Sequence, residues 1–211
     1  MPRFFNLLID KGKKGSEKMA AKKFRAIDLC YAGMFAALMA IGANITSIAP
    51  FLVIGGVPIT LQTFFAVLAG LVLGSRLGAI SMVAYMLIGL LGAPVFARFS
   101  GGFQTVLSPS FGFILSFIPA AWATGKIVEK RQNMAAYFTA SIIGMIVNYL
   151  IGTNWMYAAY KIWAQAPQAF SYKIAWMWMA VPLPKDIILS LVAGWLAHRI
   201  RAVSPLIALK R

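Results

Sequence analysis

Six long apolar segments, separated by short polar connections, constrain the fold of this chain more than any other feature. Of its 211 residues, 61% are hydrophobic and only 12% are charged, whereas a soluble domain carries about 25% charged residues. Because backbone polar groups in lipid must be satisfied within the chain, such segments are expected to be helices. The sequence therefore predicts an all-α membrane protein, a bundle of six transmembrane helices.

The boundaries of these helices are placed where prolines, glycines and charged residues interrupt the apolar runs. Several helices are shorter than the ~20 residues that a straight span needs, so we expect re-entrant or unwound connections buried by protein. The predicted helices cover residues 26–49, 59–74, 77–93, 111–128, 134–152 and 185–201.

The basic residues indicate how the bundle is oriented. The net charge of +15 is high, but the basic residues lie between apolar segments and not along one face, so we expect no nucleic-acid partner. Most of the 20 Lys and Arg residues fall before the first segment, after the sixth, or in connections on that same side. By the positive-inside rule, both termini are cytoplasmic, with a basic arm (1–25), a membrane domain (26–201) and a basic tail (202–211).

Two long connections are expected on the outer side. Residues 94–110 are rich in Gly and Ser, and residues 153–184 are crowded with Trp, Tyr and Phe. The length of the second connection is typical of a lid or binding loop. An interfacial amphipathic helix with an aromatic belt is the alternative, and the two interpretations are compatible. The sequence thus predicts long outer loops that cap a ligand pocket.

The sequence lacks the motifs that catalysis or ATP hydrolysis would need. Residues 11–16 (KGKKGS) look faintly like a phosphate loop but do not match G-x-x-x-x-G-K-[ST]. His198 is the only histidine and Cys30 the only cysteine, and no Ser-His-Asp set, paired carboxylates or metal-ligand cluster is evident. We therefore expect a protein that is not an enzyme and needs no cofactor or metal. We also expect no cleavable signal peptide.

A few polar residues stand out because they lie in or beside apolar segments. Asp186, the only one of the five acids on the outer side, starts the sixth helix. It is either a first-turn acid favoured by the helix dipole or a ligand contact. Gln62 and Asn148 are either interhelical hydrogen-bonding groups or ligand contacts. Arg98 is either an exposed arginine or a two-pronged contact for a ligand carboxylate.

Ala32, Ala36 and Ala40 recur at four-residue spacing in the first predicted helix. Small residues at this spacing allow helices to pack closely. Packing inside the bundle is one interpretation. A small-residue face presented to a partner membrane protein is the other.

Several motifs between Ala32 and Ala197 are similar to those of one family. The most specific is the polar, proline-bearing heptad at 57–63 (VPITLQT), followed by Gly70 and Gly74. Further matches lie at residues 77–81, 92–102, 148–152 and 184–186. The chain resembles the BioY proteins, the biotin-specific substrate-binding (S) components of energy-coupling-factor (ECF) transporters.

This resemblance implies a multi-pass protein of the bacterial cytoplasmic membrane that captures biotin from outside. It implies a transmembrane coupling subunit and two ATPase subunits as partners, which supply the energy that this chain cannot. In such transporters the alanine face of the first helix, here Ala32, Ala36 and Ala40, docks on the coupling subunit. The S component is thought to topple within the membrane to release its ligand.

Within the resemblance, Asp186 and Asn148 are expected to bind the polar head of biotin. Arg98 is expected to bind its carboxylate, with Lys185 in reserve. With Phe96 and Trp155 as apolar walls, the expected ligand contacts are Gln62, Phe96, Arg98, Asn148, Trp155, Lys185 and Asp186.

The chain departs from the family pattern around the presumed carboxylate end of the pocket. Arg98-Phe99 stands where the family usually has Gly-Gly, and residues 108–113 (SPSFGF) replace Gly-Pro-Thr/Ser-Gly-Gly-Tyr. The family often has a lysine three residues after the helix aspartate, where this chain has Leu189. Lys185, directly before the aspartate, is the candidate substitute.

Three alternative functions stay open at this point. The same scaffold would suit another carboxylated vitamin, lipoate or pantothenate, and competition binding separates these ligands. A stand-alone secondary transporter would need a coupling acid deep in the bundle, and Asp28 lies near a cytoplasmic helix end. A scaffold protein would use the small-residue faces, but it would explain neither the heptad at Val57 nor the polar outer loops.

Overall fold

The computed structural model describes residues 25–48, 53–54, 57–58 and 60–203. The chain divides into two units, Met1–Cys30 and Tyr31–Arg211. In the first unit, Arg25 and Asp28 form an ion pair of 3.2 Å. The cavity considered below belongs to the second unit, as do the helices apart from the first residues of α2 (Ala26–Ile48). The predicted basic arm and basic tail lie almost wholly outside the described residues.

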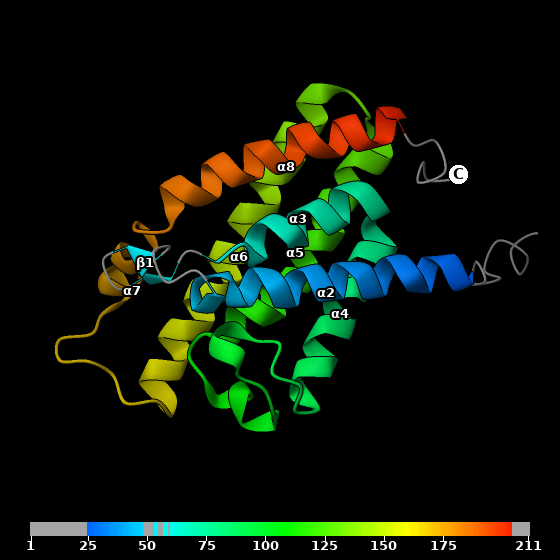
Figure 1. Ribbon diagram of the computed structural model, residues 1–211. Coiled ribbons are helices and arrows are strands. Elements are labelled where there is room, and N and C mark those ends of the chain that lie inside the picture. Colours follow the sequence, from blue (N-terminus) through cyan, green and yellow to red (C-terminus); the bar gives the residue numbers. More distant parts are fainter. Residues whose placement is uncertain (1–24, 49–52, 55–56, 59, 204–211) are drawn as a thin grey trace, which may run out of the picture. The chain divides into compact units, whose positions relative to one another are not determined.

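Helices make up nearly all of the described chain, which confirms the predicted helical class (Figure 1). The exception is a short antiparallel pair in which β1 (Val53–Ile54) faces β2 (Val57–Pro58). The helices are α2 (Ala26–Ile48), α3 (Gln62–Leu73), α4 (Ser75–Leu90), α5 (Phe111–Lys130), α6 (Met134–Ile162), α7 (Tyr172–Met179) and α8 (Leu183–Val203). Two 3-10 turns, Ala97–Phe99 and Phe103–Leu107, lie in the connection between α4 and α5.

The lengths of these helices bear on the predicted membrane spans. Within the described residues, α2, α5 and α6 are long and apolar enough to cross a membrane. Helices α7 and α8 pass the same test only together, as a pair bent by 52°. Helices α3 and α4 are apolar but have only 12 and 16 residues. The structure therefore confirms several membrane-length helices, while the number of six transmembrane spans stays a prediction.

The predicted end of the fifth helix at residue 152 is wrong, because α6 continues to Ile162. Trp155, Tyr157 and Tyr160 therefore lie on a helix and not in an outer loop. No Gly or Pro occurs between Thr153 and Ile162, so nothing in the local sequence stops the helix. The predicted end fell at Gly152, but this glycine lies buried within α6.

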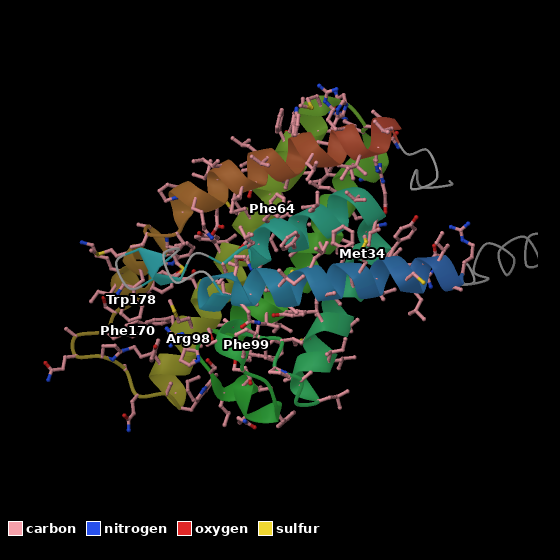
Figure 2. The ribbon with its side chains drawn as sticks, in the orientation of Figure 1. Met34, Phe64, Arg98, Phe99, Phe170 and Trp178 are labelled. Atoms are coloured by element: carbon pink, nitrogen blue, oxygen red, sulfur yellow. The ribbon has the colours of Figure 1, made fainter. Side chains whose placement is uncertain are left out.

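The outer connection that follows α6 is consequently shorter than predicted, and it contains the helix α7. Aromatic rings join its parts: Phe170 lies 4.8 Å from Tyr160 of α6 and 5.3 Å from Trp178 of α7, between ring centroids. Phe170 and Trp178 are labelled in Figure 2 at the α7 end of the bundle. Apolar ring contacts of this kind are favourable beyond their buried area, and they hold α7 against the end of α6.

Prolines explain why the observed starts of the second and sixth predicted helices differ from the predicted ones. The second helix was expected from residue 59, but Val57–Pro58 forms strand β2 and α3 begins at Gln62. The residue before a proline disfavours helical backbone, which explains the extended start of the heptad. Helix α8 begins at Leu183, two residues before the predicted start. Pro184 fits its first turn because the first N–H groups of a helix have no intrahelical partner.

Glycines let α3, α4 and α5 approach one another closely. Gly74 joins α3 to α4 with φ 86°, a backbone conformation that favours glycine. A Cβ on Gly70 would meet the Ala121 carbonyl oxygen of α5 at 2.2 Å. At the same junction, the Glu129 carboxylate accepts hydrogen bonds from the backbone N–H and the hydroxyl of Ser75, both 2.8 Å. This contact caps the first turn of α4.

The apolar core lies where α3 and α6 each pack against both α5 and α8. Its fully buried residues include Val67, Leu71, Val128 and Ala193. Several buried side chains are polar instead, among them Asn44, Gln62, Asn148 and Asp186. A buried polar group is costly without a hydrogen-bonding partner. These four residues therefore mark a part of the interior whose side chains are arranged for hydrogen bonding and not only for packing.

Candidate functional site

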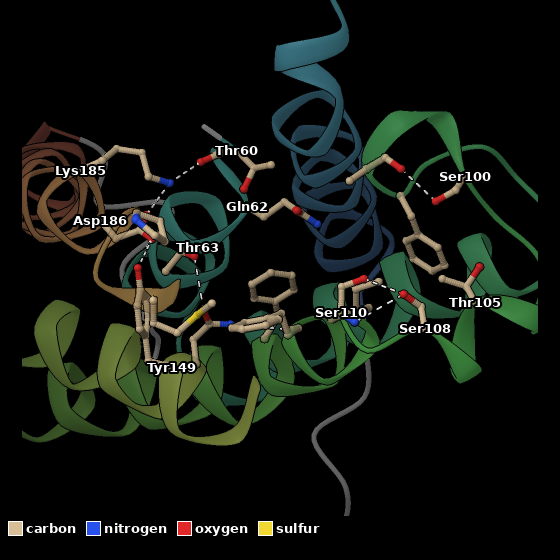
Figure 3. Close-up of a pocket in the computed structure, with 18 residues that line it drawn as sticks. Thr60, Gln62, Thr63, Ser100, Thr105, Ser108, Ser110, Tyr149, Lys185 and Asp186 are labelled. Atoms are coloured by element: carbon tan, nitrogen blue, oxygen red, sulfur yellow. Dashed lines mark hydrogen bonds and ion pairs between the residues drawn. The ribbon is translucent and has the colours of Figure 1, made fainter. Parts of the chain in front are cut away.

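A cavity of about 470 Å³ lies next to these buried polar groups. Its walls come from the start of α3, the connection between α4 and α5, the first turns of α5, the middle of α6, and the turn from α7 to α8 (Figure 3). The volume falls in the range of roughly 300–1,000 Å³ that is typical of small-molecule sites. The close-up shows polar side chains on two opposite sides, with Lys185 and Asp186 on one and Ser108 and Ser110 on the other.

The first polar side, here called the charged side, is a buried ion pair at the start of α8. The Nζ of Lys185 lies 2.7 Å from Oδ1 of Asp186 and donates a hydrogen bond of 2.8 Å to the Thr60 carbonyl oxygen. The hydroxyl of Tyr149 donates to the other carboxylate oxygen at 2.7 Å. Asp186 is only 4% exposed. Its position in the first turn of α8 also lets the helix dipole stabilise its charge.

The amide of Asn148 continues the charged side toward α5. It is 2% exposed, and its Nδ2 donates to the Ser116 hydroxyl at 2.7 Å. The Thr63 hydroxyl donates to its Oδ1 at 3.5 Å. An amide oxygen has two lone pairs, so Oδ1 keeps capacity to accept a further hydrogen bond from a ligand.

The second polar side, here called the hydroxyl side, is formed by Ser100, Thr105, Ser108 and Ser110. Among the described residues that line the cavity, none on this side is charged. The hydroxyls of Ser108 and Ser110 are 2.8 Å apart. Ser100 donates to the Ala97 carbonyl oxygen at 2.9 Å, and Thr105 lies on the same side. These residues are half-buried or exposed, whereas on the charged side Asn148, Tyr149 and Asp186 are buried and Lys185 is half-buried. Between the two sides, aromatic and aliphatic residues form the wall: Phe96, Phe113, Ile114, Phe117 and Met179.

The structure brings five of the seven predicted ligand residues to this cavity: Gln62, Phe96, Asn148, Lys185 and Asp186. Sequence reasoning missed Thr60, Thr63 and Tyr149. Thr60 and Thr63 belong to the heptad that carried the resemblance, and Tyr149 directly follows Asn148. Their positions in those motifs were the signal that could have identified them.

Arg98 and Trp155 are the two predicted ligand residues that do not line the described cavity. Arg98 is exposed and has left-handed backbone, with φ 60° and ψ 35°. Trp155 packs instead against Phe111 and Trp163, with ring centroids 6.0 and 5.9 Å away. Arg98 as the carboxylate partner and Trp155 as an apolar wall therefore stay predictions. The positions of the two side chains outside the cavity lining give them no support.

The predicted partner face of the first helix consists of Ala32, Ala36 and Ala40, and the structure shows how exposed these residues are. Ala32 and Ala36 are 2% and 5% exposed, and Ala40 is half-buried. Gly33 and Ala37, each one residue further along α2, are exposed. The burial of Ala32 and Ala36 is consistent with packing inside the bundle, and the docking of this face on a partner stays a prediction.

The chemistry of the cavity suits binding. The described residues contain no group of three His, Cys, Asp or Glu side chains that could hold a metal ion. The cavity offers one carboxylate, one ammonium, two amides and several hydroxyls around an aromatic wall. Such a site fits a small molecule with a polar head, an apolar body and a polar tail.

The fold and this site define the class of protein: a helical protein with membrane-length apolar helices and a cavity for a small molecule. The fold is similar to a crystal structure of the S-component for biotin from an ECF-type ABC transporter, with TM-score 0.69 and 24% identity. The match covers 83% of this chain and 90% of that one.

The family follows from the sequence relatives. BioYB of Bacillus subtilis (strain 168) is 48% identical over 184 residues, which are 86% of this chain and 91% of the relative. The biotin transporter BioY of Rhodobacter capsulatus is 34% identical over 186 residues, 85% of this chain and 95% of the relative. The BioY family model matches residues 16–205, and the chain belongs to the BioY family. It is therefore a protein of a transporter family and not an enzyme.

Proposed function

We propose that this chain captures biotin from outside as the S component of an ECF-type importer. Membership of the BioY family and the biotin transporters among its relatives support this function. The observation that carries it is the buried charged side of the cavity. The ureido ring of biotin has two N–H donors and one carbonyl acceptor. Asp186 can accept from the N–H groups, and Lys185 can donate to the carbonyl oxygen.

The remaining hydrogen-bonding capacity of the charged side fits this assignment. An ionised carboxylate has about four lone-pair sites, and Tyr149 and Lys185 occupy two of them at Asp186. An ammonium has three donors, and Lys185 uses two of them on Asp186 and Thr60. Each group therefore keeps capacity for a ligand. The Oδ1 of Asn148 adds a further acceptor for a ureido N–H.

The same distances support one orientation of the ligand. Because Lys185 Nζ and Asp186 Oδ1 are 2.7 Å apart, both must contact the same end of an extended ligand. We therefore assign Lys185 to the head of biotin and not to its carboxylate. The carboxylate then faces the hydroxyl side, where Ser108 and Ser110 can donate hydrogen bonds. Arg98, two residues before Ser100, would reach it only by turning its exposed side chain inward.

The proposal includes location and partners. The chain would lie in the bacterial cytoplasmic membrane as a multi-pass protein with both termini cytoplasmic, as the distribution of Lys and Arg favours. A transmembrane coupling subunit and two ATPases would supply the energy. For Ala32 and Ala36 to meet the coupling subunit, α2 would have to change its packing, since both are buried here.

Equilibrium binding to the purified, detergent-solubilised protein tests the proposal. Biotin is titrated alone and in competition with lipoate and pantothenate. Tight, biotin-selective binding is the expected result, because neither competitor carries a ureido ring to match the charged side. Preferred binding of lipoate or pantothenate would transfer the function to that vitamin. A folded sample that binds none of the three would contradict the proposal.

A further inference from the structure

The wall of the cavity formed by residues 95–100 has an unusual backbone. Arg98 and Phe99 both have positive φ, 60° and 52°. Non-glycine residues rarely adopt this conformation, because the Cβ approaches the backbone, and they keep it only when their surroundings impose it. The backbone N–H of Phe96 donates to the Ser100 carbonyl oxygen at 3.0 Å, so the segment closes on itself as a tight loop. Figure 2 labels the two residues at its turn.

Asn44, on α2, contacts this loop on both sides of the turn. Its Oδ1 accepts a hydrogen bond of 2.6 Å from the backbone N–H of Phe99. Its Nδ2 donates to the Val95 carbonyl oxygen at 3.4 Å, and to the Ala40 carbonyl oxygen of its own helix at 3.0 Å. Asn44 is 3% exposed. A single buried amide thus connects α2 to both ends of the loop.

Tyr85, on α4, connects the same loop to the opposite part of the cavity. Its hydroxyl donates to the Val95 carbonyl oxygen at 3.1 Å and accepts from the Gln62 amide at 3.1 Å. Its ring packs edge-on against Phe96, with centroids 5.5 Å apart. Phe96 and Gln62 both line the cavity. The Asn44–Tyr85 network therefore runs from the loop to Gln62 through a continuous set of hydrogen bonds.

We infer that Asn44 is a positioning residue for ligand binding: it holds the 95–100 loop in its left-handed turn, so that Phe96, Ala97 and Ser100 line the cavity. Asn44 does not line the cavity itself. It acts through the loop backbone, and loss of its two contacts leaves the Phe99 N–H without this partner and the Val95 carbonyl oxygen with Tyr85 alone. The inference rests on the proposed function, because the ligand whose affinity it sets is the one proposed for this cavity.

A spin label on the loop tests the contact without any ligand. Cys30 is the only cysteine, so Cys30→Ser with Phe99→Cys gives one labelling position. The Phe99 side chain is 55% exposed, and the hydrogen bond to Asn44 uses the backbone, so the label leaves it intact. We expect an immobilised label in this background and a mobile one after Asn44→Ala. A label that is equally immobile in both would overturn the inference.

Asn154→Ala is the matched control. Asn154 likewise donates to the carbonyl oxygen four residues back, at 2.7 Å from Leu150, but it is exposed and does not contact the loop. Its loss should leave the label immobile and the biotin affinity unchanged. If Asn44→Ala does not fold, Asn44→Asp replaces it: this variant keeps the acceptor for Phe99 and loses the donor to Val95, so an intermediate label mobility is expected.

Biotin titration of the same variants completes the experiment. Asn44→Ala should raise the Kd by about tenfold, which corresponds to the loss of one to two hydrogen bonds of ordinary strength. An unchanged Kd with a mobile label would overturn the role of Asn44 in binding. If the unmutated protein itself binds no biotin, the proposed function fails, and the label alone then decides whether Asn44 holds the loop.

Discussion

The two polar sides of the cavity are built in different ways. The charged side consists of neighbouring residues on regular helices, Lys185 and Asp186 on α8 and Tyr149 on α6, joined by an ion pair and a hydrogen bond to the charge. The hydroxyl side consists of irregular backbone between α4 and α5, next to a loop with two left-handed residues. Regular helices carry the first side, and hydrogen bonds between elements hold its side chains in place. Irregular backbone between two helices carries the second.

This difference matters for what each side can bind. The charged side is buried, and its net charge is zero, because the ammonium of Lys185 balances the carboxylate of Asp186. A neutral head with several hydrogen-bonding groups fits there without leaving a charge unpaired. The hydroxyl side is more accessible and can donate hydrogen bonds to a carboxylate that keeps part of its hydration. The comparison therefore predicts unequal effects of mutation on the two sides.

Asp186→Asn should have the largest effect on binding. It removes the negative charge, replaces one of the two accepting carboxylate oxygens by an NH2 donor, and leaves the Lys185 ammonium without its counter-charge. A hydrogen bond to a charged group contributes about 1.5–3 kcal/mol, so we expect biotin affinity to fall by a corresponding amount in a titration. Glu129→Gln removes an acid that does not line the cavity and serves as the control. Unchanged affinity in a folded Asp186→Asn protein would exclude Asp186 from the site.

Lys185→Met should come next, with a loss of about 1–2 kcal/mol in binding. Methionine keeps the length and the apolar stem while removing the ammonium that contacts Asp186 and Thr60. The comparison is sharpened by the matched variant Arg98→Met, measured in the same assay. If Lys185→Met and Arg98→Met lost the same amount of biotin affinity, this would contradict the difference between the two polar sides of the cavity.

Tyr149→Phe should have a smaller effect, about 1 kcal/mol. It removes the 2.7 Å hydrogen bond to Asp186 but leaves the ion pair with Lys185 to hold the carboxylate. Tyr157→Phe, on the same helix but outside the cavity lining, is the control for the loss of a hydroxyl. An effect as large as that of Asp186→Asn would show that Tyr149 and not Lys185 orients the carboxylate.

Arg98→Met should have the smallest effect, within about 0.5 kcal/mol, as is usual for exposed side chains without buried contacts. The prediction follows from the exposed position of Arg98 outside the cavity lining. A loss of affinity for biotin that is absent for biotin amide would instead show that Arg98 turns inward and binds the carboxylate, as the sequence suggested.

Sequence reasoning was accurate where local pattern determines structure. The apolar segments predicted the helices, and polar residues within them, Gln62, Asn148 and Asp186, do line the cavity. It failed where a residue was assigned to the site from its side-chain chemistry, without knowledge of the backbone conformation around it. Arg98 was chosen for its charge, but its direction depends on a left-handed turn. Trp155 was assigned to a connection because the helix was expected to end at Gly152, although α6 continues to Ile162.

Asn44 illustrates what a single sequence cannot supply. Nothing within the first apolar segment distinguishes it from an ordinary interhelical asparagine. Its partners Val95 and Phe99 lie 51 and 55 residues away. Backbone groups are present at every position, so their pairing with a particular side chain leaves no mark in the sequence. The same holds for the contact between Lys185 and the Thr60 carbonyl oxygen.

The most direct test of the two-sided cavity is the ratio of Kd for biotin amide to Kd for biotin, measured in the unmutated protein and in Lys185→Met. The amide blocks only the carboxylate end of the ligand. If the charged side binds the ureido head, Lys185→Met weakens both ligands by the same factor and the ratio does not change. If the ratio falls to one in Lys185→Met, Lys185 binds the carboxylate, and the orientation proposed for the ligand is reversed.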